Sequence, residues 1–187
     1  LEEGFGATGR SLFNLELGLE TYPMTIGQGM AQELEHSAIS ARKVLERIPA
    51  EKFDWTPHPK SMTFLKLASH VAESLGWAAY TLDTSELDVE PVGGPKFESY
   101  VAKSVPELLE TFDKNLAVSI QALKNVSDAT LMETWTMKKA GEVMFSFPKL
   151  IIMRSFILDH LVHHRAQLGL YLRLNEISVP AMLGPSA

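Results

Sequence analysis

Residues 150–174 read LIIMRSFILDHLVHHRAQLGLYLRL, and this stretch decides the fold. Apolar side chains recur along it three or four residues apart, which predicts a helix with one buried face. That face comprises Leu150, Met153, Ile157, His160, His164, Gln167 or Leu168, and Tyr171. The pattern predicts one long helix from about Phe147 to Leu174, with Ser146 as its N-cap and Pro148 in its first turn.

Two histidines interrupt the apolar face of this helix. His160 and His164 are four residues apart, so their imidazoles lie on the same side, one helical turn from each other. A buried imidazole needs partners for both ring nitrogens. A metal ion on one nitrogen and a carboxylate or carbonyl oxygen on the other would meet that need. The pair is therefore a candidate for chelating one ion.

Three further helices are expected upstream, at residues 26–48, 62–82 and 104–125, each with apolar residues at helical spacing. Pro49 ends the first of them. Ser61 is the expected N-cap of the second, and Ser104 pairs with Glu107 as the capping box of the third. Residues 83–99 read as a solvated acidic loop. Residues 131–147 place aromatic and β-branched residues around Gly141, which predicts a short irregular hairpin. The expected fold is an all-α four-helix bundle with this hairpin between its third and fourth helices.

A third metal ligand should come from another helix, and His70 is the best candidate because it lies in mid-helix beside a buried stripe. Three imidazoles and one open position are typical of a catalytic zinc site, whereas structural sites fill all four positions with protein ligands. Glu73 or Asp159 could close the site. Core histidines that hold no metal are the remaining alternative.

Composition excludes several function classes. The 187 residues carry a formal net charge of −6, which argues against binding to nucleic-acid phosphates. There is no cysteine, so disulfides, thiolate ligands and a cysteine nucleophile are excluded. No apolar run reaches the roughly 18 residues that span a membrane, and no signal peptide is recognisable. A cytoplasmic location is expected.

The first 23 residues differ in character from the rest, since they are Gly-rich and have no clean period. We expect residues 1–23 to be an N-terminal extension, either upstream sequence or sequence added for expression, with Met24 as the natural start. Residues 24–187 are then the domain itself.

Four motifs in order give the chain a resemblance to the DinB/YfiT-like superfamily. They are WTPHPKSMT at 55–63, LASHVAE at 67–73, HLVHHRAQL at 160–168 and VPAMLGPSA at 179–187. The third is similar to the family pattern H-x-x-x-H-R-G-Q, with Ala166 where glycine is more usual. Because alanine is also small, close helix packing should survive this departure.

The resemblance implies a metal triad made of His70, His160 and His164, with zinc or nickel as the ion. It also implies a homodimer. The family includes thiol S-transferases and a thiol-dependent isomerase, so a low-molecular-weight thiol is the expected co-substrate.

The function expected on this basis is a metal-dependent enzyme, a thiol-dependent S-transferase acting on a small electrophilic molecule. A metal-dependent hydrolase and a non-catalytic metal-binding stress-response protein are the alternatives. No catalytic residue beyond the metal ligands can be identified from the sequence.

Overall fold

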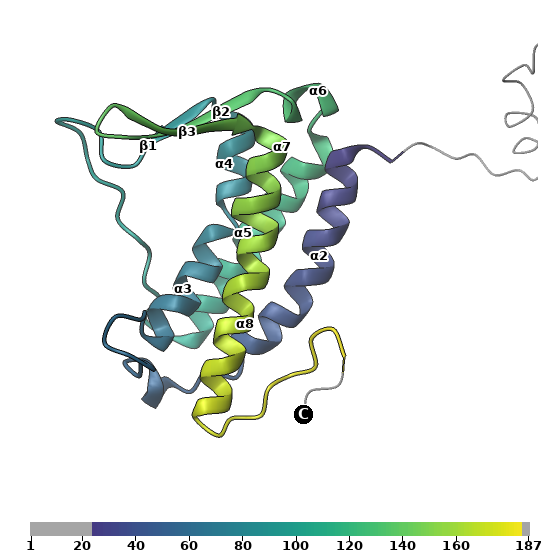
Figure 1. Ribbon diagram of the computed structural model, residues 1–187. Coiled ribbons are helices and arrows are strands. Elements are labelled where there is room, and N and C mark those ends of the chain that lie inside the picture. The colour runs from purple at the N-terminus through teal and green to yellow at the C-terminus, as the bar shows by residue number, and fades with distance from the viewer. Residues whose placement is uncertain (1–23, 185–187) are drawn as a thin grey trace, which may run out of the picture.

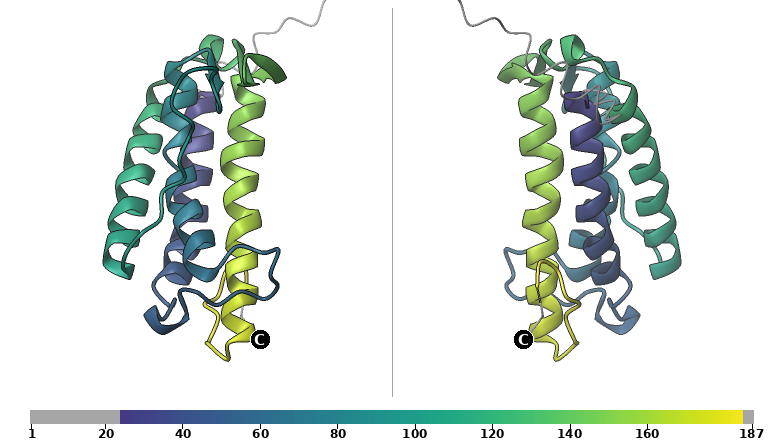
Figure 2. Two further views of the ribbon diagram at one scale, coloured as in Figure 1. Left: turned by 90° about the vertical axis from the view of Figure 1, so that its left-hand side faces the viewer. Right: turned by 90° about the vertical axis from the view of Figure 1, so that its right-hand side faces the viewer.

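The computed structural model describes residues 24–184, so the extension expected at residues 1–23 lies outside the described residues. The chain order of the elements is α2 (Ile26–Leu45), a 3-10 turn (Ala50–Lys52), α3 (Phe64–Ser74), α4 (Trp77–Asp83), β1 (Glu86–Asp88), α5 (Val105–Asn125), α6 (Asp128–Leu131), β2 (Thr134–Lys139), β3 (Glu142–Pro148), α7 (Lys149–Ile152), a π-helix (Met153–Leu158) and α8 (Asp159–Leu174). The long helical segments stand side by side, and the strands lie across one end of them (Figures 1 and 2).

Helices α2 and α5 are long and uninterrupted, and each begins at a side-chain cap. The Thr25 hydroxyl accepts the Gln28 backbone N–H, and the Gln28 side chain accepts the Thr25 N–H in return. Ser104 accepts the Glu107 N–H as predicted, whereas the Glu107 carboxylate accepts the N–H of Lys103 instead of Ser104. Helix α2 ends three residues earlier than predicted, and the Arg47 and Ile48 N–H groups that follow it make tighter bonds to residues three positions back.

The helix predicted at 62–82 is two helices in the structure. It begins at Thr63, whose hydroxyl accepts the Lys66 N–H, so the prediction of Ser61 as the N-cap was wrong. The helix breaks at Leu75 and Gly76, where the Gly76 N–H bonds the carbonyl of Glu73 in a tighter turn. A Cβ at Gly76 would lie 3.3 Å from the Asn115 side chain, so the lack of a side chain here lets α5 approach closely.

The last helical run also differs from its prediction. It begins at Lys149, because the strand β3 continues through Ser146 and Pro148. Ser146 is therefore not a cap, and its hydroxyl bonds the hydroxyl of Thr136 on the neighbouring strand, at 2.8 Å. Helix α7, the π-helix and α8 follow one another without a break, so an extra residue is inserted within an otherwise continuous helical run.

A three-stranded sheet makes the all-α prediction too narrow. Strands β2 and β3 form the predicted hairpin, which turns at Ala140 and Gly141 with φ values of 52° and 83°. Strand β1 comes from the loop that was expected to be a solvated connection, and it pairs with β2 in parallel. The Asp88 carboxylate at the end of β1 accepts the N–H groups of Glu90, Ala140 and Gly141, which ties this loop to the hairpin turn.

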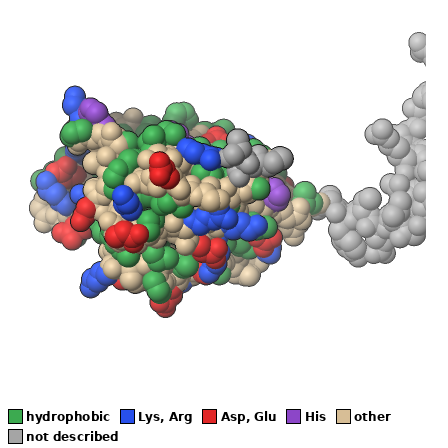
Figure 3. Space-filling model, turned by 90° about the horizontal axis from the view of Figure 1, so that it is seen from below, with side chains coloured by type: hydrophobic (Ala, Val, Ile, Leu, Met, Phe, Trp, Pro, Cys, Tyr) green, Lys and Arg blue, Asp and Glu red, His purple; other side chains and the backbone are tan. Residues whose placement is uncertain are grey.

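The hydrophobic core lies between the long helical segments. Its largest fully buried side chains include Leu34, Phe64, Phe112, Leu161 and Leu168. Within residues 24–184, no helix combines the length and apolar character needed to cross a membrane. The face seen from below carries acidic and basic side chains interspersed with apolar ones (Figure 3).

Candidate metal centre

Three histidines from two separate helical runs converge on one point. His70 comes from α3, and His160 and His164 come from α8. The Nε2 atom of His160 lies 3.1 Å from Nε2 of His70 and 2.7 Å from Nε2 of His164. Each ring offers one nitrogen within 4.8 Å of the other two, so the three could hold a metal ion. The sequence predicted this set of residues; ligation itself stays a prediction.

Hydrogen bonds among the three rings cannot satisfy their nitrogens. An imidazole nitrogen has a single in-plane site, which is either a proton or a lone pair. The Nε2 atom of His160 can therefore make one good hydrogen bond, yet two other Nε2 atoms lie within 3.1 Å of it. A cation that accepts a lone pair from every Nε2 removes this conflict. The donor set thus fits a divalent ion that imidazole binds.

The opposite ring nitrogens show how two of the rings are oriented. Nδ1 of His164 lies 2.7 Å from Oε1 of Gln167, so this nitrogen carries the proton and Nε2 is left free to donate its lone pair. Nδ1 of His160 is buried and has no hydrogen-bond partner of good geometry among residues 24–184. The Phe156 carbonyl, one turn earlier, is close enough to raise the pKa of this ring slightly.

Electrostatics keep the three rings neutral near pH 7. Burial and, as a smaller cause, the neighbouring histidines together lower the pKa of His160 to about 4. Burial also lowers the pKa of His70 and of His164, although Gln167 opposes the change at His164. Metal ligation requires unprotonated imidazole. The burial that lowers these pKa values therefore leaves the rings ready to bind an ion without first losing a proton.

The other histidines do not belong to the cluster. His163 is exposed, with its ring centroid 4.8 Å from that of His164. His58 and His36 are exposed, as the sequence suggested, and Nδ1 of His58 accepts the Lys60 N–H.

Neither carboxylate considered as a fourth ligand belongs to the cluster. Glu73 is turned toward the loop before α5, where Oε1 accepts the Tyr100 N–H at 3.1 Å. Burial raises the pKa of Glu73, because its Oε2 atom is buried without a hydrogen-bond partner in the described part of the chain. Asp159 is exposed. Among residues 24–184, no fourth His, Asp or Glu joins the three histidines.

Trp77 is the neighbour of the triad that sequence reasoning missed. Its ring stacks on His160, with centroids 5.6 Å apart and planes 21° apart, and meets His70 edge to face at 5.5 Å. It directly follows the helix break at Gly76. The Gly76-Trp77 pair in the sequence was the available signal, since glycine within a helical pattern weakens the helix.

Comparison with known proteins identifies the family of the chain. The family model of the DinB superfamily matches residues 33–168. The crystal structure of a DinB-like protein from Bacillus cereus superposes with a TM-score of 0.63 and 20% identity, covering 84% of this chain and 97% of that one. A DinB-like protein from Bacillus subtilis, YjoA, gives the same TM-score at 13% identity, covering 84% of this chain and 99% of that one. No curated protein matches the sequence. At such identities the two structures show a shared fold, whereas the family match spans most of the chain. The chain therefore belongs to the DinB superfamily, the family that its histidine and proline motifs indicated.

Proposed function

We propose that the protein is a metal-dependent enzyme that joins a small thiol to an electrophilic small molecule. One observation carries the proposal: three neutral imidazoles present their Nε2 atoms to one point, and no fourth protein ligand completes the set within residues 24–184. Such a site has a position left for an exchangeable ligand, as catalytic zinc sites do. Zinc or nickel is the ion we propose, since both suit imidazole nitrogen.

A divalent ion at this point would lower the pKa of a bound thiol or water and so supply a nucleophile near neutral pH. The transfer itself forms a bond between sulfur and carbon and breaks the bond to the leaving group, which departs with its electron pair. The thiol proton passes to solvent. The described residues contribute orientation: Gln167 fixes the tautomer of His164, and Trp77 fixes the ring plane of His160.

Metal analysis of untagged protein tests the first half of the proposal. We expect about one ion per chain in the wild type, and loss of that ion in His70→Ala, His160→Ala and His164→Ala. His163→Ala is the matched control, because this histidine lies on the same helix but is exposed. An ion retained by all three triad variants would overturn the site.

Turnover assays with the metal-loaded protein test the second half. Thiols of different size are combined with a chlorinated dinitrobenzene, and thioether formation is followed by absorbance. Thioether formed by the wild type and lost in His160→Ala would support the transferase. Hydrolysis of ester substrates without any thiol would instead favour the hydrolase, and a metal-loaded protein inactive in both assays would favour a non-catalytic metal-binding protein.

A further inference from the structure

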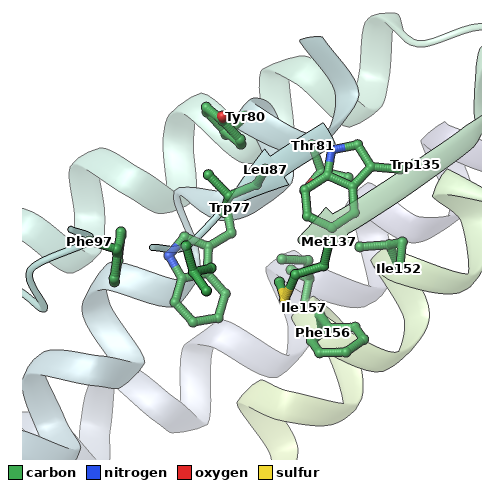
Figure 4. A pocket seen from close by; sticks show the side chains of 11 residues that line it. Trp77, Tyr80, Thr81, Leu87, Phe97, Trp135, Met137, Ile152, Phe156 and Ile157 are labelled. Atoms are coloured by element: carbon green, nitrogen blue, oxygen red, sulfur yellow. The ribbon is translucent and has the colours of Figure 1, made fainter. Parts of the chain in front are cut away.

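A cavity of about 390 Å³ lies between α4, the sheet and the π-helix. Figure 4 shows its side chains, which surround a common space although they come from distant parts of the sequence. The walls that matter here are formed by Trp77, Leu87, Val89, Met137, Phe156 and Ile157.

The lining of the cavity is predominantly apolar. No charged side chain lines the cavity. The indole N–H of Trp135, one of its few polar groups, already donates to the Thr84 hydroxyl at 3.1 Å. A carboxylate or phosphate placed here would lose its hydration with no cation to replace it, which is costly. The occupant that this lining fits is therefore uncharged and apolar.

The size of the cavity suits a small organic group. A cavity of about 150 Å³ lined by apolar side chains is large enough to bind benzene. The present cavity is more than twice as large and falls within the range of small-molecule sites, roughly 300–1,000 Å³. A two-ring aromatic group or a branched alkyl group of similar volume fits this space.

One wall of the cavity is also the outer layer of the histidine cluster. Trp77 lines the cavity and stacks on His160, and Phe156 lines it one helical turn before His160. A molecule held in the cavity would therefore lie against the side chain that covers the metal centre. None of the three histidines lines the cavity, so Trp77 is the side chain that the cavity and the histidine cluster share.

We propose that this cavity binds the uncharged, apolar part of the electrophilic substrate, with the reactive carbon directed toward the three histidines. The assignment of this part to a substrate rests on the proposed function. The two reactants would then occupy different places. The apolar group of the electrophile enters the cavity, whereas a polar or charged thiol must approach the histidines from outside the cavity.

Direct binding tests the cavity without any turnover. N-phenyl-1-naphthylamine is an uncharged probe whose fluorescence rises in apolar sites, and we expect saturable binding of about one molecule per metal-free or metal-loaded chain. Naphthalene should displace it, whereas naphthoate, of similar shape but charged, should compete at least tenfold less well. Failure of the probe to bind, or equal competition by naphthoate, would overturn the proposal.

Two valine-to-phenylalanine variants, one inside the cavity and one outside it, locate the bound probe. Val89→Phe places a ring in the cavity and should weaken probe binding at least tenfold. Val118→Phe makes the same change at a position of α5 that is 49% exposed and outside the cavity, and should leave binding unchanged. Equal affinities in the two variants would contradict the assignment.

A second readout covers the case in which Val89→Phe does not fold. Trp77 and Trp135 line the cavity, so 1-bromonaphthalene should quench the tryptophan fluorescence of the wild type saturably. Quenching that rises linearly without saturation would overturn the proposal. Loss of metal binding with retained probe binding would contradict the proposed function alone, because the probe does not need the metal.

Discussion

Helices α2 and α5 differ from the two helical runs that carry the histidines in their regularity. Each of the former continues for 20 or 21 residues without interruption. The run containing His70 breaks at Leu75 and Gly76, and the run containing His160 includes a π-helix that ends two residues before it. Both interruptions direct side chains at the cavity, Trp77 in one case and Phe156 in the other. The difference teaches that all four runs fill the core, whereas only the interrupted runs build the site.

The largest expected effect is a loss of stability when the regular helices α2 and α5 are disturbed. Phe112 on α5 is fully buried, so Phe112→Ala should lower the free energy of unfolding by about 3–5 kcal/mol. The metal content of the protein that remains folded should not change. Urea denaturation followed by circular dichroism measures the loss, and Val118→Ala on the exposed side of the same helix is the control. A loss below about 1 kcal/mol would show that α5 is less important to stability than its burial indicates.

The next largest effect is a loss of metal affinity, and it concerns the helical run that carries His160 and His164. Gln167→Leu removes the oxygen that holds Nδ1 of His164, and should lower the metal affinity by about 10–100-fold. Stability should change little, because Gln167 is only partly buried. Gln121→Leu, at an exposed position of α5, is the matched control. Competition with a chromogenic chelator gives the affinities, and equal values for the two variants would mean that the hydrogen bond does not position the ligand.

A pH titration of the metal-free protein gives a smaller effect. The pKa of His160 is lowered to about 4 in the folded state, against an ordinary value of 6.5, and the pKa values of His70 and His164 are lowered too. Between pH 6.5 and about 4 the unfolded chain therefore binds more protons than the folded chain. The free energy of unfolding should fall as the pH drops through this window.

Urea denaturation at a series of pH values measures this slope. His160→Phe should flatten it, because the variant lacks the imidazole with the most strongly lowered pKa. A slope that is the same in the variant and the wild type would assign the acid sensitivity to other groups.

The smallest expected effect concerns an ion pair on the surface of helices α2 and α5. Arg42 on α2 pairs with Asp113 on α5 through two hydrogen bonds of 2.8 and 3.0 Å. Both side chains are more than a third exposed, so Asp113→Asn should cost no more than about 1 kcal/mol. The difference from the wild type should shrink in 1 M salt, which screens exposed pairs. A large loss that salt does not reduce would make this pair a major link between the two helices.

The regular helices could be predicted from the sequence because local signals determine them. Thr25 and Ser104 are side-chain caps, and the apolar residues that follow recur at helical spacing. The break at Gly76 was missed because the apolar period continues through Leu75 and Ala78 on both sides of it. The π-helix has no signature in its own residues. Strand β1 was missed because its partner, β2, lies about 50 residues away and its own composition is acidic.

The histidines could be predicted because the spacing of His160 and His164 and the helical position of His70 are visible in the sequence. The side chains that contact these imidazole rings could not be predicted. Gln167 was assigned to the inward face without a role, and the contact of Trp77 with His160 joins two helical runs that are distant in the sequence. The cavity is assembled from four separate segments, so no local pattern could predict it.

The Asp88 carboxylate has a consequence for how molecules exchange with the cavity. Its hydrogen bonds to the backbone of Glu90, Ala140 and Gly141 fasten one wall segment to the hairpin turn. We therefore expect that wall to stay in place while a guest comes and goes. Entry and departure would then depend on whether the widest group of the bound molecule can pass between neighbouring side chains. The residence time of the molecule should therefore increase more with its width than with its length.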